Sequence, residues 1–86
     1  MRRRLKGRRN NLRLLRVGHS LTQEDMADKL QVTRGTYVLI ETGKSGGNRK
    51  FWERLQETFN IPNEEMYSLM QKEESEHESE IANADS

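Results

Sequence analysis

Segment 21–43 constrains the fold of this chain most, because two short helical patterns lie there on either side of a tight turn. Thr22 is a favourable N-cap, and Asp25 three residues later completes a pattern close to a capping box. Thr33 caps the second helix, and Gly43 ends it. We therefore expect a pair of short helices that cross steeply and pack one face against each other.

Three more helices are expected from the spacing of apolar residues. One runs from near Asn10 to Val17, Asn48 caps another after a flexible loop at 44–47, and the last begins at Pro62 or Asn63. With no alternating strand pattern and no repeat, the fold class is all-α with five short helices. The expected inward residues are Leu12, Leu15, Met26, Ala27, Leu30, Val32, Tyr37, Ile40, Phe51, Trp52, Leu55, Phe59, Met66, Leu69 and Met70.

Charge is distributed very unevenly along the 86 residues. Residues 1–72 contain all 15 Lys and Arg and eight acids, a net +7, whereas residues 73–86 contain six acids and no Lys or Arg. We therefore predict a disordered basic arm at 1–9, a domain at 10–71 and a disordered acidic tail at 72–86. A cationic body with an anionic tail indicates a polyanionic partner.

Enzymatic and membrane functions have little support. The chain has no cysteine, and His19 and His77 lack metal-ligand spacing to each other or to an aspartate. The glycines of a phosphate-binding loop come directly after a strand, but no strand pattern precedes the glycines at 43, 46 and 47. No apolar run approaches the roughly 20 residues of a membrane span. We expect a cytoplasmic protein without enzyme activity, cofactor or metal.

Segment 21–43 closely resembles the helix-turn-helix of the phage-repressor (Xre/Cro-like) family, and the resemblance extends more loosely over residues 9–70. It implies that the helix after Thr33 enters the DNA major groove, and Ala27 allows the preceding helix to approach it closely. Gln31 replaces the glycine that is common in the family turn, so its backbone must adopt either a positive φ or another turn geometry. Tyr37 replaces the usual Ile or Val, and we expect its ring in the core with the hydroxyl at the rim.

The resemblance also implies which residues contact DNA. Gln23 matches a phosphate-contacting residue at a helix N-terminus, where phosphate is favoured. Arg34 matches a base-reading position and can offer two hydrogen bonds to guanine, with a phosphate contact as the alternative. Ordinary solvation is the alternative role of Gln23, Thr36, Lys44, Asn48 and Arg49. The candidate DNA-binding set is Gln23, Thr33, Arg34, Gly35, Thr36, Val38, Leu39, Lys44, Asn48 and Arg49.

Two residues of this set differ from those usual in the family, and one further pair outside the set matches the family. Val38 and Leu39 stand where polar residues are usual, and they either touch a thymine methyl or pack against a neighbouring helix or subunit. The family often pairs an arginine late in its first helix with the glutamate that ends the groove helix. Arg16 and Glu41 match these positions, and we expect a structural pair rather than two unrelated surface charges.

These residues imply a sequence-specific transcriptional regulator, a repressor that binds a palindromic operator on double-stranded DNA as a homodimer. The resemblance suggests a small Cro-like regulator of a phage or mobile element, or an ordinary bacterial regulator. One alternative is an antitoxin or protein-interaction module on the same fold, with the tail or residues 38–39 binding a protein. A second is a non-specific nucleic-acid binder with steep salt dependence. We also hypothesise that residues 73–86 compete with phosphates for the basic arm.

Overall fold

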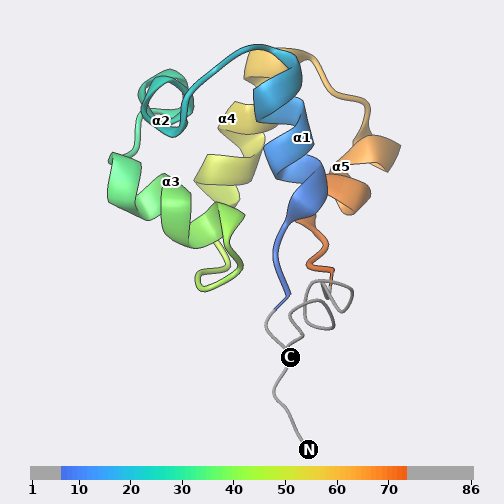
Figure 1. Cartoon of the computed structure of the whole chain (residues 1–86). Coiled ribbons are helices and arrows are strands. Elements are labelled where there is room, and N and C mark those ends of the chain that lie inside the picture. The colour runs from blue at the N-terminus through green and yellow to red at the C-terminus, as the bar shows by residue number, and fades with distance from the viewer. Residues whose placement is uncertain (1–6, 74–86) are drawn as a thin grey trace, which may run out of the picture.

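The computed structural model describes residues 7–73, which form five helices and no strand longer than an isolated bridge (Figure 1). The predicted all-α fold is thereby confirmed. The remainder of the predicted arm and tail, residues 1–6 and 74–86, lies outside the described residues. The helices are α1 (Asn10–Gly18), α2 (Gln23–Leu30), α3 (Arg34–Glu41), α4 (Arg49–Phe59) and α5 (Asn63–Met70).

The helices surround one apolar core. Helix α2 packs on α3 and α4, while α1 packs on α5 and α3; in Figure 1, α4 lies between the α2–α3 pair and the α1–α5 pair. Met70 is 40% exposed although the spacing predicts it inward, because it is the last residue of α5 and lies at the edge of the core. The buried apolar residues are Leu12, Met26, Ala27, Leu30, Tyr37, Ile40, Phe51, Trp52, Leu55, Ile61 and Leu69.

The predicted caps define the starts of three helices. At α2, Thr22 Oγ1 accepts from the amide of Asp25, and Asp25 Oδ2 accepts from the amide of Thr22, both at 3.0 Å. Thr33 caps α3 through the amide of Thr36 at 3.1 Å, and Asn48 caps α4 through the amide of Phe51 at 2.9 Å. Each cap satisfies an amide that has no partner within its helix.

The turn between α2 and α3 takes the left-handed conformation at Gln31, with φ 61° and ψ 41°. The amide of Val32 donates to the carbonyl of Ala27, and that of Gln31 to the carbonyl of Asp28, which together form a Schellman motif. Val32 then packs against the core. Of the two geometries left open for Gln31, the positive φ is the one adopted, at a cost of about 1 kcal/mol.

The ends of the described chain pair with each other. Arg8 and Glu73 exchange two backbone hydrogen bonds, of 3.0 and 2.8 Å, in an antiparallel bridge. Arg9 is only 6% exposed. Residues 7–9 and 72–73 therefore belong to the folded unit, whereas the charge pattern places them in the arm and the tail. The pattern misleads there because a run of arginines carries no sign that one of them is buried.

Candidate nucleic-acid interface

Helix α3 has a buried back and an exposed front. Tyr37 and Ile40 are buried, whereas Arg34, Gly35 and Thr36 are all exposed. The front of α3 is therefore open to a partner, as a groove-binding helix requires. Further along it, Leu39 is 45% exposed and Val38 is half-buried, so the two apolar residues differ in what they offer a partner.

The N-terminal turn of α3 presents two polar groups to solvent. Arg34 is its first residue and is exposed, so its guanidinium can reach a base edge or a phosphate. The Thr33 hydroxyl is already used, because it accepts from the amide of Thr36 and donates to Thr36 Oγ1 at 2.9 Å. Thr36 can still donate its own hydroxyl hydrogen outward.

The structure brings Arg16, Glu41 and Gln23 together at the end of α3. Arg16 Nη2 and Nε lie 3.2 and 3.3 Å from Glu41 Oε2, and Gln23 Nε2 donates to Glu41 Oε1 at 3.2 Å. Glu41 is 4% exposed and the Arg16 side chain 13%, so the pair is largely desolvated. Arg16 Nη1 also donates to the carbonyl of Leu21. The network joins α1, the start of α2 and the end of α3.

This network positions the side chain of Gln23 but uses only part of its hydrogen-bonding capacity. One amide hydrogen is committed to Glu41, while the second hydrogen and the amide oxygen have no partner within residues 7–73. Gln23 is the first residue of α2 and is half-buried. A phosphate at this helix start would meet both the remaining amide hydrogen and the free backbone amides.

Tyr37 departs from its predicted position. Its hydroxyl is buried and has no hydrogen-bond partner in the part of the chain that the structure describes, whereas we expected it at the rim. The core extends past α3 here, with the Phe51 ring centroid 6.4 Å from that of Tyr37. Burial, with the negative charge of Glu41 adding to it, raises the pKa of Tyr37 well above its usual value. The phenol is thus neutral.

The loop that joins α3 to α4 is held by the indole of Trp52. Trp52 Nε1 donates to the carbonyl of Gly46 at 3.0 Å. Gly47 has φ 72°, and a Cβ there would lie 2.9 Å from Trp52 Nε1, so only glycine fits without a shift. The expected flexible loop is therefore anchored. It places Lys44 at one end and Asn48 with Arg49 at the other, all exposed.

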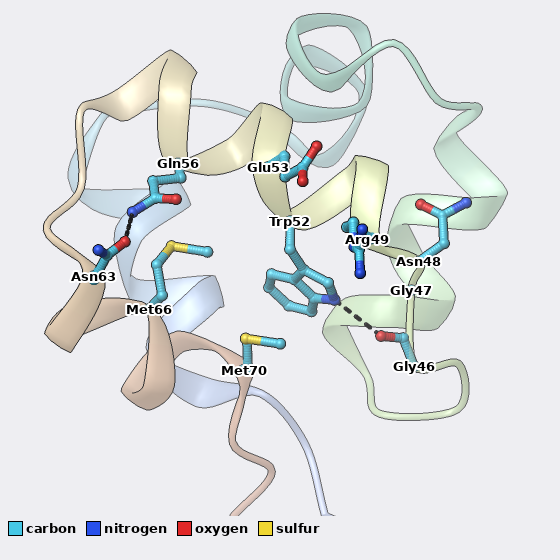
Figure 2. Close-up of a pocket in the computed structure, with 10 residues that line it drawn as sticks. All are labelled: Gly46, Gly47, Asn48, Arg49, Trp52, Glu53, Gln56, Asn63, Met66 and Met70. Carbon is cyan, nitrogen blue, oxygen red and sulfur yellow. Dashed lines mark hydrogen bonds between the residues drawn. The ribbon is translucent and has the colours of Figure 1, made fainter.

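Figure 2 shows a pocket of about 520 Å³ between this loop, α4 and α5. Trp52, Met66 and Met70 give it an apolar lining, and Gln56 Nε2 donates to Asn63 Oδ1 at 2.6 Å along its far side. Asn48 and Arg49 from the candidate DNA-binding set lie at its edge. The sequence gives no sign of the pocket, because its lining comes from segments that are neighbours only in the fold.

The described residues offer few groups for other chemistry. Between Gly7 and Glu73, no cluster of three His, Cys, Asp or Glu side chains could hold a metal ion. His19 packs its ring against that of Phe59, with 4.8 Å between the centroids. No helix in the same range is long and apolar enough to cross a membrane.

Two short helices joined by a tight turn, the second with a buried back and an exposed front, are typical of the helix-turn-helix class. The chain belongs to the helix-turn-helix domain family, which matches residues 10–74. It is 37% identical over 59 residues to an uncharacterized HTH-type transcriptional regulator of Methanocaldococcus jannaschii, over 69% of this chain and 89% of the relative. No solved structure matches. The resemblance seen in segment 21–43 is thus confirmed at the level of the family.

Proposed function

We propose that this protein is a sequence-specific, DNA-binding transcriptional regulator. The observation that carries the proposal is the open front of α3, where Arg34 and Thr36 are exposed while Tyr37 and Ile40 hold the helix from behind. Membership of the helix-turn-helix family and the name of the relative from Methanocaldococcus jannaschii support it.

In this proposal the DNA contacts are of two kinds, base-specific contacts and contacts to the phosphate backbone. Arg34 donates to guanine in the major groove, with Thr36 and Leu39 beside it, the latter touching a thymine methyl. Gln23 binds a phosphate on one side of α3. On the other side, Lys44, Asn48 and Arg49 bind phosphates of the DNA strand. The positive charge of residues 1–72 adds attraction that does not depend on base order.

We further propose that the protein acts in the cytoplasm as a homodimeric repressor on a palindromic operator. Helix α3 has eight residues and is about 12 Å long, so one copy reads few base pairs. Two copies on half-sites one helical turn apart double the contact and match a two-fold symmetric site. A dimer on such a site represses by excluding other proteins from it.

The test is selection of bound sequences from a random duplex pool with the full chain. We expect an enriched motif with two inverted half-sites whose centres are about 10 base pairs apart. A pool that stays random would overturn sequence-specific binding. An enriched motif without inverted symmetry would overturn the palindromic dimer alone.

A second candidate is a protein-interaction module on the same fold, such as an antitoxin. The observation that favours it is the 45% exposure of Leu39, an apolar side chain on the open front of α3. A stable complex of defined stoichiometry with a partner protein, together with DNA affinity that is independent of base order, would support this function over the first.

A further inference from the structure

Beside the start of α2 lies a small pocket with an unusual concentration of positive charge. Its volume is about 90 Å³, and four arginines line it, Arg8, Arg9, Arg13 and Arg16, together with Gln23 and Glu41. A water molecule takes about 30 Å³ in the liquid, so the pocket can hold a group the size of a few waters. Only Gln23 of these six belongs to the candidate DNA-binding set.

Two of the four arginines are committed to the protein itself. Arg9 donates to the carbonyls of Ile40, Ser45 and Met70, at 2.6, 2.9 and 2.9 Å. Arg16 is paired with Glu41. Both carboxylate oxygens of Glu41 are used, since Gln23 occupies the second. The single acid of the pocket is therefore neutralised from within.

Arg8 and Arg13 are in a different situation. Both residues are exposed and line the pocket, and neither side chain has a hydrogen-bond or salt-bridge partner within residues 7–73. The backbone of Arg8 is fixed by its bridge to Glu73, and Arg13 lies within α1. Two arginines whose side-chain donors are available thus line the same pocket from a fixed backbone.

The helix ends around the pocket add to its preference for an anion. Asn10, the first residue of α1, and Gln23, the first residue of α2, both line it, so the positive ends of two helix dipoles lie close by. The negative end of α3 is also near, but Arg9 already donates to its carbonyl at Ile40. The exposed carboxylate of Glu73 accepts from Asn10 Nδ2 at 3.2 Å beside the pocket, but four arginines and two helix N-termini outweigh this one acid, so the local field favours a negative group.

We propose that this pocket binds a phosphodiester group of the DNA backbone, with Arg8 and Arg13 as the donors and Gln23 at its inner edge. The inference rests on the proposed function, because it is the docking of α3 that brings the strand to the start of α2. It adds a contact from α1 and the segment before it, and it extends the grip on DNA beyond the helix-turn-helix pair.

The test compares Arg8→Ala, Arg13→Ala and the double variant with the wild-type chain on the selected duplex and on a random duplex, over a range of salt concentrations. We expect the double variant to lose affinity several-fold on both duplexes alike. The slope of log affinity against log salt should become about one less negative for each arginine removed. Lys29→Ala is the matched control, since Lys29 is exposed near the opposite end of α2 from Gln23, and it should leave the slope unchanged.

A second arm locates the phosphate. In a series of duplexes, one phosphate at a time is replaced by a neutral methylphosphonate. At one position the replacement should lower the affinity of the wild-type chain but not that of the double variant. An unchanged affinity and salt slope in the double variant, with the wild type still binding its selected duplex, overturns the pocket and leaves the proposed function standing. A wild-type chain that binds no duplex overturns both.

Discussion

The guanidinium carbon of Arg9 lies 5.3 Å from the centre of the Trp52 ring. The same group donates to three carbonyls, which belong to α3, to the loop after it and to the end of α5. Because Trp52 in turn holds Gly46 of that loop, Arg9 connects the two helices to the segment that carries Lys44, Asn48 and Arg49. Desolvation by burial lowers the pKa of Arg9, but an arginine stays charged at neutral pH.

Arg9→Ala is expected to lower the free energy of unfolding by about 2–4 kcal/mol, since it removes charged hydrogen bonds and leaves three carbonyls without their donor. Arg9→Lys should restore only part of this, because an ammonium cannot reproduce the planar fork. Urea denaturation measures both. Arg8→Ala is the control and should change stability by less than about 0.5 kcal/mol. Equal effects of Arg8→Ala and Arg9→Ala would contradict the role of Arg9.

The features that short-range spacing specifies were predictable. Thr22 and Asp25 are three residues apart and satisfy each other's amides, so their capping box is visible in the sequence. The same holds for the caps at Thr33 and Asn48. Periodicity likewise identifies Leu12, which is buried as expected.

The features that long-range contacts create were not predictable. Arg9 meets carbonyls 31, 36 and 61 residues away, and nothing in a run of arginines distinguishes the one that is buried. The hydroxyl of Tyr37 depends on how far the core extends beyond α3, which the spacing of apolar residues does not specify. The positive φ of Gln31 was one of two open geometries, and packing of Val32 on the core accompanies it.

Removing one partner of the Arg16–Glu41 pair should be costly. Arg16→Met leaves the carboxylate of Glu41 desolvated without its cation, and we expect a loss of about 3 kcal/mol in the free energy of unfolding. Arg16→Met combined with Glu41→Gln should recover most of that loss, because neither position of the pair then carries a buried charge without its partner. Denaturant unfolding of the four members of this double-mutant cycle measures the coupling. A double variant no more stable than Arg16→Met alone would argue against a desolvated pair.

Tyr37→Phe should stabilise the protein by about 1 kcal/mol, since it removes a buried hydroxyl that lacks a partner. It should also alter the response to alkaline pH. Because the folded state keeps the phenol protonated while the unfolded state loses this proton above a pH of about 10, stability falls by up to about 1.4 kcal/mol per pH unit there. The variant should lack this component. Thermal unfolding between pH 8 and 11 checks it, with the exposed Tyr67→Phe as the control.

The acidic tail should weaken binding to random DNA. The backbone bridge between Arg8 and Glu73 sets the end of the basic arm beside the beginning of the acidic tail, and the carboxylate of Glu73 accepts from Asn10 at the arginine-lined pocket. Truncation after Glu73 keeps this bridge and removes five of the six tail acids. We expect a several-fold higher affinity for random duplex at low salt, with the difference vanishing as salt screens the tail. Unchanged affinity at low salt would rule out competition by the tail.

The distinction between base-specific and backbone contacts predicts different losses of DNA affinity for two substitutions. Arg34→Ala should weaken binding to the selected site by about 1–3 kcal/mol and binding to random DNA far less, because a guanine contact exists only in the correct register. Gln23→Ala should weaken both duplexes to the same degree, since a phosphate carries no base identity. It also removes a donor from Glu41, so its thermal stability must be measured alongside. Fluorescence anisotropy with both duplexes separates the two patterns. If Arg34→Ala loses the same affinity on random DNA as on the selected site, Arg34 contacts a DNA phosphate, and the base contacts must come from other residues of α3.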